Sequence, residues 1–81
     1  MKIGDKVRVL ETAKDSLNLP CSKTLPCEGI IVFQYAVGGF VVASPAWIGI
    51  GNPPEDVIWE ASPSSTWDCQ NLFADVLEVI K

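Results

Sequence analysis

The amino-acid sequence predicts a mainly β fold, a small barrel of about five strands with a short helical turn before the last strand. The chain opens on Gly4-Asp5-Lys6-Val7-Arg8-Val9-Leu10, where charged and apolar residues alternate with the two-residue period of a strand. Residues 73–80 have the pattern of a turn of helix that leads into a closing strand, and an apolar hairpin lies between the two ends. We therefore expect the first and last strands to pair. A chain of 81 residues is expected to form one domain, residues 1–81.

The first strand is expected at residues 6–10, with its two valines facing the core and its lysine and arginine facing solvent. A long polar connection follows at residues 11–27. Its prolines, Pro20 and Pro26, argue against regular structure in its second half. Connections of this length are often functional or mobile.

The second strand is expected at residues 29–35 and the third at residues 40–44. The turn between them contains Gly38-Gly39, and glycine readily adopts the positive φ that a tight hairpin turn requires. A small sheet normally has one apolar face and one wet face. The second strand is instead apolar on both, because Ile30 and Ile31 point to opposite sides. Such a strand lies between two layers or at a subunit interface, and we favour the interface.

The loop at residues 45–54 is unusual because it is apolar and carries no charge. Its large hydrophobic residues are Trp47, Ile48 and Ile50, interleaved with glycine and proline. The loop is either a lid over the end of the barrel or a contact surface, since tryptophan is enriched at binding hot spots.

The last third of the chain allows two interpretations. In the first, a fourth strand at residues 57–61 is followed by the helical turn at 73–76 and a final strand at 77–80. In the second, residues 67–80 form one amphipathic helix packed on an antiparallel sheet. The second rests on the helical spacing of Leu72, Phe73, Val76, Leu77 and Ile80.

Charge and hydropathy exclude two classes of partner. The net charge is −4, from 10 acidic and 6 basic residues, so we do not expect the chain to bind nucleic acid. No charged residue lies between Glu28 and Glu55, but the glycines, the proline and the β-branched residues of that stretch favour strands over a membrane helix. The first residues lack the apolar core of a secretory signal, so a cytoplasmic location is expected.

The residue inventory also limits the chemistry. There is no histidine, so neither a Ser-His-Asp nor a Cys-His arrangement can form. The cysteines, Cys21, Cys27 and Cys69, are odd in number and lack zinc spacing. We therefore expect no metal, no cofactor and no single-chain active site. Symmetry can still gather a shared site from several copies, and an apolar content of 48% in so short a chain favours self-association.

The segments at residues 4–9, 28–32, 39–42 and 77–80 together resemble the SH3-like small β-barrel, a class with many unrelated functions. Within it, the chain resembles the plasmid- and integron-borne type II dihydrofolate reductase family. A Val-Gln-Ile-Tyr segment of that family lines the central pore of a homotetramer, and Gln70 is the matching residue here. The chain is similar at the same level to the variable subunit of ferredoxin–thioredoxin reductase and to small accessory subunits of photosynthetic electron-transfer complexes. The resemblance to these two groups implies a non-catalytic role.

Two main hypotheses for function follow. The first is a non-catalytic protein–protein interaction or accessory module that self-associates. The second is a small-molecule-binding or catalytic pore at a homo-oligomer interface, as in type II dihydrofolate reductase. A small inhibitor or immunity protein is a third, suggested by size and acidity. The candidate binding residues are Trp47, Ile48 and Ile50 for the first hypothesis and Trp67, Gln70 and Asn71 for the second.

Overall fold

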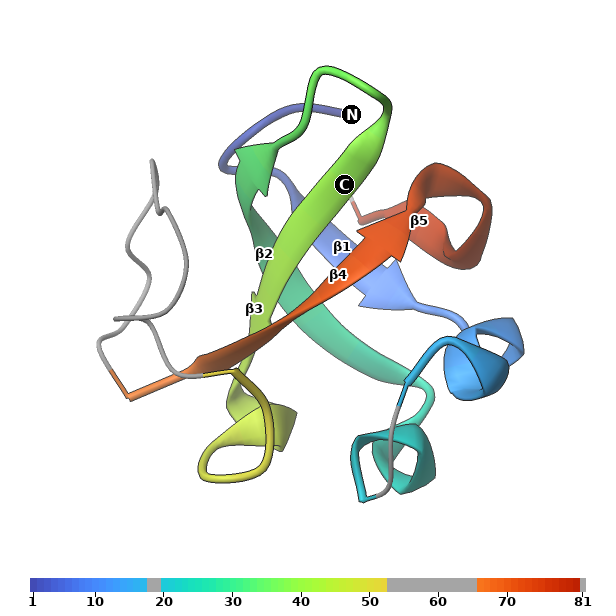
Figure 1. The fold of residues 1–81 in the computed structure, drawn as a ribbon, viewed down its shortest axis with the longest axis vertical. Coiled ribbons are helices and arrows are strands. Elements are labelled where there is room, and N and C mark those ends of the chain that lie inside the picture. Colours follow the sequence, from blue (N-terminus) through green and yellow to red (C-terminus); the bar gives the residue numbers. More distant parts are fainter. Residues whose placement is uncertain (18–19, 53–65, 81) are drawn as a thin grey trace.

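In the computed structural model, which describes residues 1–17, 20–52 and 66–80, the chain folds as a five-stranded antiparallel sheet with the order β4-β3-β2-β1-β5 (Figure 1). The mainly β prediction is confirmed, and so is the pairing of the first and last strands, in which Arg8 lies opposite Glu78. The strand predicted at residues 57–61 lies outside the described residues. The strands are β1 (Lys6–Val9), β2 (Cys27–Gln34), β3 (Gly39–Ser44), β4 (Asp68–Phe73) and β5 (Leu77–Val79).

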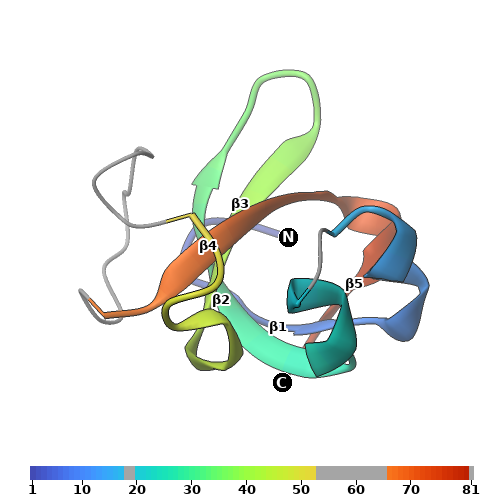
Figure 2. The ribbon, with the colours of Figure 1, turned by 60° about the horizontal axis from the view of Figure 1, so that its bottom comes forward.

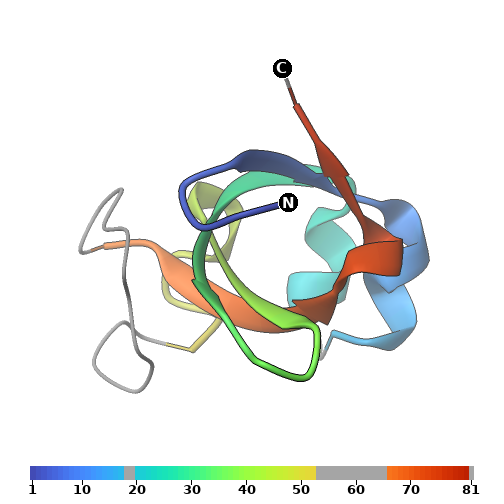
Figure 3. The same ribbon diagram turned by 90° about the horizontal axis from the view of Figure 1, so that it is seen from above.

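The sheet is curled but it is not closed. Figure 3 shows the strands curving around one side of the molecule. Within the described residues, β3 is the only strand that pairs with β4, and β1 is the only strand that pairs with β5. These two strands are therefore the edges of an open sheet, and the closed barrel predicted from the sequence is not formed by strand pairing.

The C-terminal segment contains no long helix, so the amphipathic helix over residues 67–80 is wrong. The chain forms β4, a 3-10 turn η5 (Ala74–Val76) and β5. Pairing with β3 satisfies the backbone groups of β4 that face it, and the strand buries Cys69 on one face of the sheet and Leu72 on the other. A helix over this segment would bury only one apolar stripe.

Three short 3-10 turns gather at one end of the sheet (Figure 2). They are η1 (Glu11–Asp15), η2 (Cys21–Thr24) and η3 (Pro45–Trp47). The connection predicted to be irregular therefore contains two turns, and each turn buries one small residue, Ala13 in η1 and Cys21 in η2. None of the helical segments among the described residues is long and apolar enough to cross a membrane.

The sheet buries residues on both of its faces. The inner face carries the main core, whose members include Val7, Val9, Ile31, Val42, Trp47 and Leu72. The opposite face, called the outer face below, carries a second cluster of Val32, Val41, Ala43 and Cys69, with Phe33 and Trp67 partly buried against it. The single chain thus buries both faces of the central strands. Val32 is therefore covered within the single chain, and the subunit interface that the sequence favoured stays a prediction.

Candidate functional site

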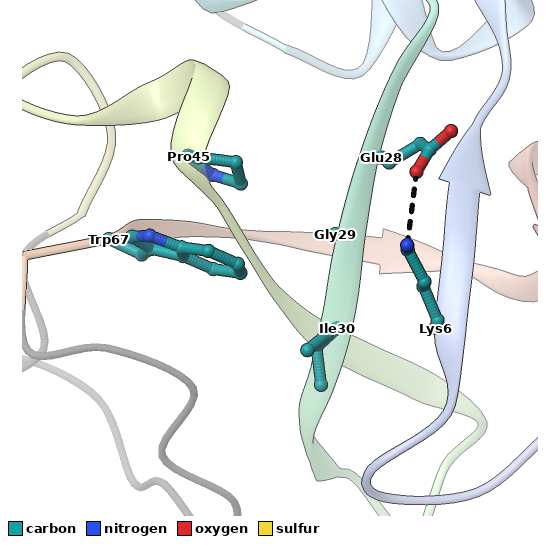
Figure 4. Close-up of a pocket in the computed structure, with 6 residues that line it drawn as sticks. All are labelled: Lys6, Glu28, Gly29, Ile30, Pro45 and Trp67. Atoms are coloured by element: carbon teal, nitrogen blue, oxygen red, sulfur yellow. Dashed lines mark ion pairs between the residues drawn. The ribbon is translucent and has the colours of Figure 1, made fainter.

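A pocket of about 280 Å³ opens on the outer face, beside the second cluster (Figure 4). Its lining residues come from β1, β2, η3 and the position just before β4. Lys6 and Glu28 point outward from β1 and β2, because their neighbours Val7 and Gly29 are buried. Trp67 comes directly before β4. The described lining residues are Lys6, Glu28, Gly29, Ile30, Pro45 and Trp67.

The pocket has an apolar wall and a charged wall. Figure 4 shows the rings of Pro45 and Trp67 on one side of β2, and Glu28 and Lys6 on the other. Lys6 Nζ lies 3.5 Å from Glu28 Oε1, and these side chains are 60% and 51% exposed. A solvated pair of this kind contributes little to stability. Both charged groups therefore remain accessible to a ligand.

Buried hydrogen bonds hold the apolar wall in place. The Ser44 hydroxyl donates to the carbonyl of Glu28 at 2.7 Å and accepts the N–H of Ala46 at 3.1 Å. These bonds tie the start of η3, and with it Pro45, to β2. On the other side, the Asp68 carboxylate accepts the N–H of Gly49 at 2.9 Å, which ties the residue after Trp67 to the loop that follows η3.

The three candidate pore residues do not all lie on the same face of the sheet. Trp67 lines the pocket, and Asn71 is exposed on the same outer face, two residues beyond Cys69. Gln70 lies on the inner face, where its side-chain amide donates to Cys21 Sγ at 3.4 Å. Within one chain, therefore, these residues do not line a common surface.

The three candidate binding residues in the loop after β3 differ in their exposure to solvent. Trp47 is fully buried in the main core, and its indole N–H donates to Thr24 Oγ1 at 3.0 Å. It therefore belongs to the core and is not a contact residue, which corrects the first hypothesis at this position. Ile48 and Ile50 are exposed, and the carbonyl of Ile50 accepts a hydrogen bond from Cys21. The loop covers the end of the core in the manner of a lid and presents its two isoleucines to solvent.

The sequence reasoning missed most of the pocket. Lys6, Glu28, Ile30 and Pro45 were not candidates. The outward direction of Lys6 was readable from strand alternation, but its approach to Glu28 depends on the register in which β1 pairs with β2. That register is a tertiary property.

The thiols are protected from reaction. Cys21 and Cys27 are free thiols, and Cys21 and Cys69 are buried. Burial raises the pKa of Cys21 above its ordinary value of 9.0, against the opposing effect of the hydrogen bond from Gln70, and burial also raises the pKa of Cys27. The thiolate is the nucleophilic form, so both groups are weak nucleophiles at neutral pH. Among the described residues, no group of three His, Cys, Asp or Glu side chains is placed to hold a metal ion.

These raised pKa values predict a loss of stability at alkaline pH. The unfolded thiols ionise near pH 9, whereas the folded thiols remain protonated to higher pH. The stabilisation is complete below pH 9 and is lost as pH rises through the folded-state values. We expect the urea midpoint to fall as the pH rises above about 9, and to fall less in a Cys27→Ala variant. An equal fall in the two proteins would contradict this assignment.

Comparison of the chain with protein-family models, with curated proteins and with solved structures found no match. The site is therefore interpreted from its own geometry.

Proposed function

We propose that this protein is a non-catalytic interaction module that binds a protein partner through the pocket on its outer face and also self-associates. The pocket is the observation that supports the first part of the proposal, the binding of a protein partner. Its volume of about 280 Å³ lies at the lower end of the range for small-molecule sites and suits one or two side chains of a protein partner.

The chemistry of the lining suggests what such a partner offers. Trp67, Pro45 and Ile30 supply contact for an apolar side chain, and tryptophan is among the residues that most often dominate interface energies. Lys6 and Glu28 stand opposite them and can each pair with a charged residue next to that side chain. The proposed ligand is therefore a short segment with one apolar anchor and an adjacent charge.

The SH3-like barrel is retained as part of this proposal. It is supported by the strand order β4-β3-β2-β1-β5, by the pairing of β1 with β5 and by the 3-10 turn η5 before the last strand. The cytoplasmic location is retained as well, supported by Cys21 and Cys27, which are free thiols.

Substitution of Trp67 tests the pocket. Short peptides selected from a random library against the protein are expected to share an apolar residue beside a charged one. Trp67→Ala is expected to weaken their binding at least about tenfold in calorimetry, because loss of a hot-spot side chain costs more than about 1.4 kcal/mol.

Ile48→Ala is the matched control, because Ile48 is an exposed apolar residue outside the lining of the pocket. Its peptide affinity is expected to equal that of the wild type. If selected peptides bind the Trp67→Ala variant as tightly as the wild type, the pocket is not the binding site.

A further inference from the structure

Strand β4 lies at an edge of the sheet. Only some of its backbone N–H and carbonyl groups that point away from β3, called outward groups below, form hydrogen bonds. The N–H and the carbonyl of Cys69 bond to Asn52, at 2.8 and 2.9 Å, on the side away from β3. In an antiparallel ladder the outward groups recur at every second residue, so those of Asn71 and Phe73 also point away from β3. Within the described chain, no backbone hydrogen bond uses the outward groups of Asn71 or the outward N–H of Phe73. The Phe73 carbonyl stands at the N-cap of η5, where it accepts the first bond of that 3-10 turn.

Exposed aromatic side chains lie beside this open edge. Phe73 is 63% exposed. Its ring and that of Tyr35 border Gly39: a Cβ at Gly39 would lie 3.8 Å from Phe73 Cε1 and 3.6 Å from Tyr35 Cδ2. Tyr35 packs edge-to-face on Phe33, with ring centroids 5.1 Å apart. We call Phe33, Tyr35 and Phe73 the aromatic patch.

The open edge lacks the features that usually prevent strand addition. Such edges are commonly protected by charged residues, proline or a very short strand. Residues 69–73 contain neither a charge nor a proline. The opposite edge differs, since β5 has three residues and carries Glu78, whose carboxylate lies 3.0 Å from Arg8. An extended strand is thus the occupant that fits β4.

We propose that two copies of this chain pair through their β4 edges, antiparallel, about a two-fold axis at Leu72. This interface rests on the self-association in the proposed function and gives it a location. The two outward residues lie on either side of Leu72. The axis therefore sets Asn71 opposite the partner's Phe73, and Phe73 opposite the partner's Asn71. Each such pair exchanges two backbone hydrogen bonds, which uses both outward groups of Asn71 and the N–H of Phe73. The Phe73 carbonyl, which already accepts a bond within η5, accepts its second bond from the partner.

Self-complementarity makes a second copy a better occupant than an arbitrary peptide. In this register Phe73 and the partner's Phe73 are diagonal neighbours on the outer face, about 7–8 Å apart and within reach of aromatic contact. The two aromatic patches then lie on the same side of one continuous sheet. The pairing ends at Cys69, where Asn52 already occupies the edge. The interface is small, so we expect a dimer that depends on protein concentration.

Sedimentation velocity over a range of concentrations tests the interface in three proteins. The wild type is expected to dimerise, and Phe73→Lys is expected to be monomeric because it places two cations close together. Val37→Lys is the matched control: it makes the same kind of change at the tip of the β2–β3 hairpin, where Val37 is 88% exposed. It is expected to dimerise like the wild type. Circular dichroism confirms that the variants are folded.

Amide exchange gives a second readout without mutation. The amide protons of Asn71 and Phe73 are expected to gain protection as the wild-type concentration rises, whereas that of Val37 is unaffected. A dimer that persists in Phe73→Lys, or is lost only in Val37→Lys, leaves self-association intact and overturns the β4 interface. If the wild type is monomeric at every concentration, both the proposed self-association and the β4 interface are wrong. The peptide-binding proposal is tested separately by Trp67→Ala.

Discussion

The Trp47→Ala variant is expected to lose about 3–5 kcal/mol of unfolding free energy. Trp47 is fully buried in the main core, and among the residues that the structure describes it is the largest fully buried side chain. Its removal leaves a cavity between η3 and the sheet and also removes the bond from the indole N–H to Thr24. Typical stabilities per residue give a domain of this size about 4–12 kcal/mol in all. The substitution is therefore expected to remove a large fraction of the total free energy of unfolding.

Urea unfolding followed by circular dichroism measures this loss. Ile48→Ala, in the exposed part of the same loop, is the control and is expected to change the free energy of unfolding by less than about 0.5 kcal/mol. Trp47→Phe retains an aromatic ring but not the indole N–H. Its stability therefore distinguishes the contribution of packing from that of the hydrogen bond to Thr24. If Trp47→Ala were as stable as Ile48→Ala, the placement of Trp47 in the core would be wrong.

The Gly29→Ala variant is expected to be destabilised by about 1–3 kcal/mol, the usual cost of overpacking. A Cβ at Gly29 would lie 2.5 Å from the carbonyl oxygen of Ala43 and 2.8 Å from a methyl group of Val42. The first of these is backbone in the neighbouring strand and cannot rotate away. The glycine thus allows β2 to approach β3 closely, where the sheet curls.

Gly39→Ala is the matched control, because it makes the same change in the same pair of strands. A Cβ at Gly39 would meet its neighbours at ordinary van der Waals distances, and Gly39 does not have a positive φ. We expect this variant to be as stable as the wild type or slightly more stable, since alanine restricts the unfolded chain. Equal effects of the two substitutions in urea unfolding would refute the close approach at Gly29.

Local patterns were sufficient to predict much of the fold. The alternation in residues 6–10 predicted β1, and the glycines between two apolar runs predicted the hairpin of β2 and β3. The short turn before a final strand was predicted as well, and it is η5 followed by β5. These features depend on side-chain period and on glycine conformation, which neighbouring residues determine.

The candidate site depended on the tertiary structure. Trp47 and Trp67 are both tryptophans that the sequence indicated as candidate binding residues, yet one is buried in the core and the other lines the pocket. The strand at residues 68–73 was also missed from the sequence, and it forms because β3 supplies a partner for its backbone.

By itself, the sequence determined that β1, β2, β3 and β5 are strands and that β1 pairs with β5. Only the tertiary structure decided which apolar residues are covered, that Lys6 meets Glu28 beside Trp67, and that β4 is an edge with open backbone groups. The reason is physical: strand periodicity is a local property, whereas burial, register and edge position depend on which distant segment packs against each strand.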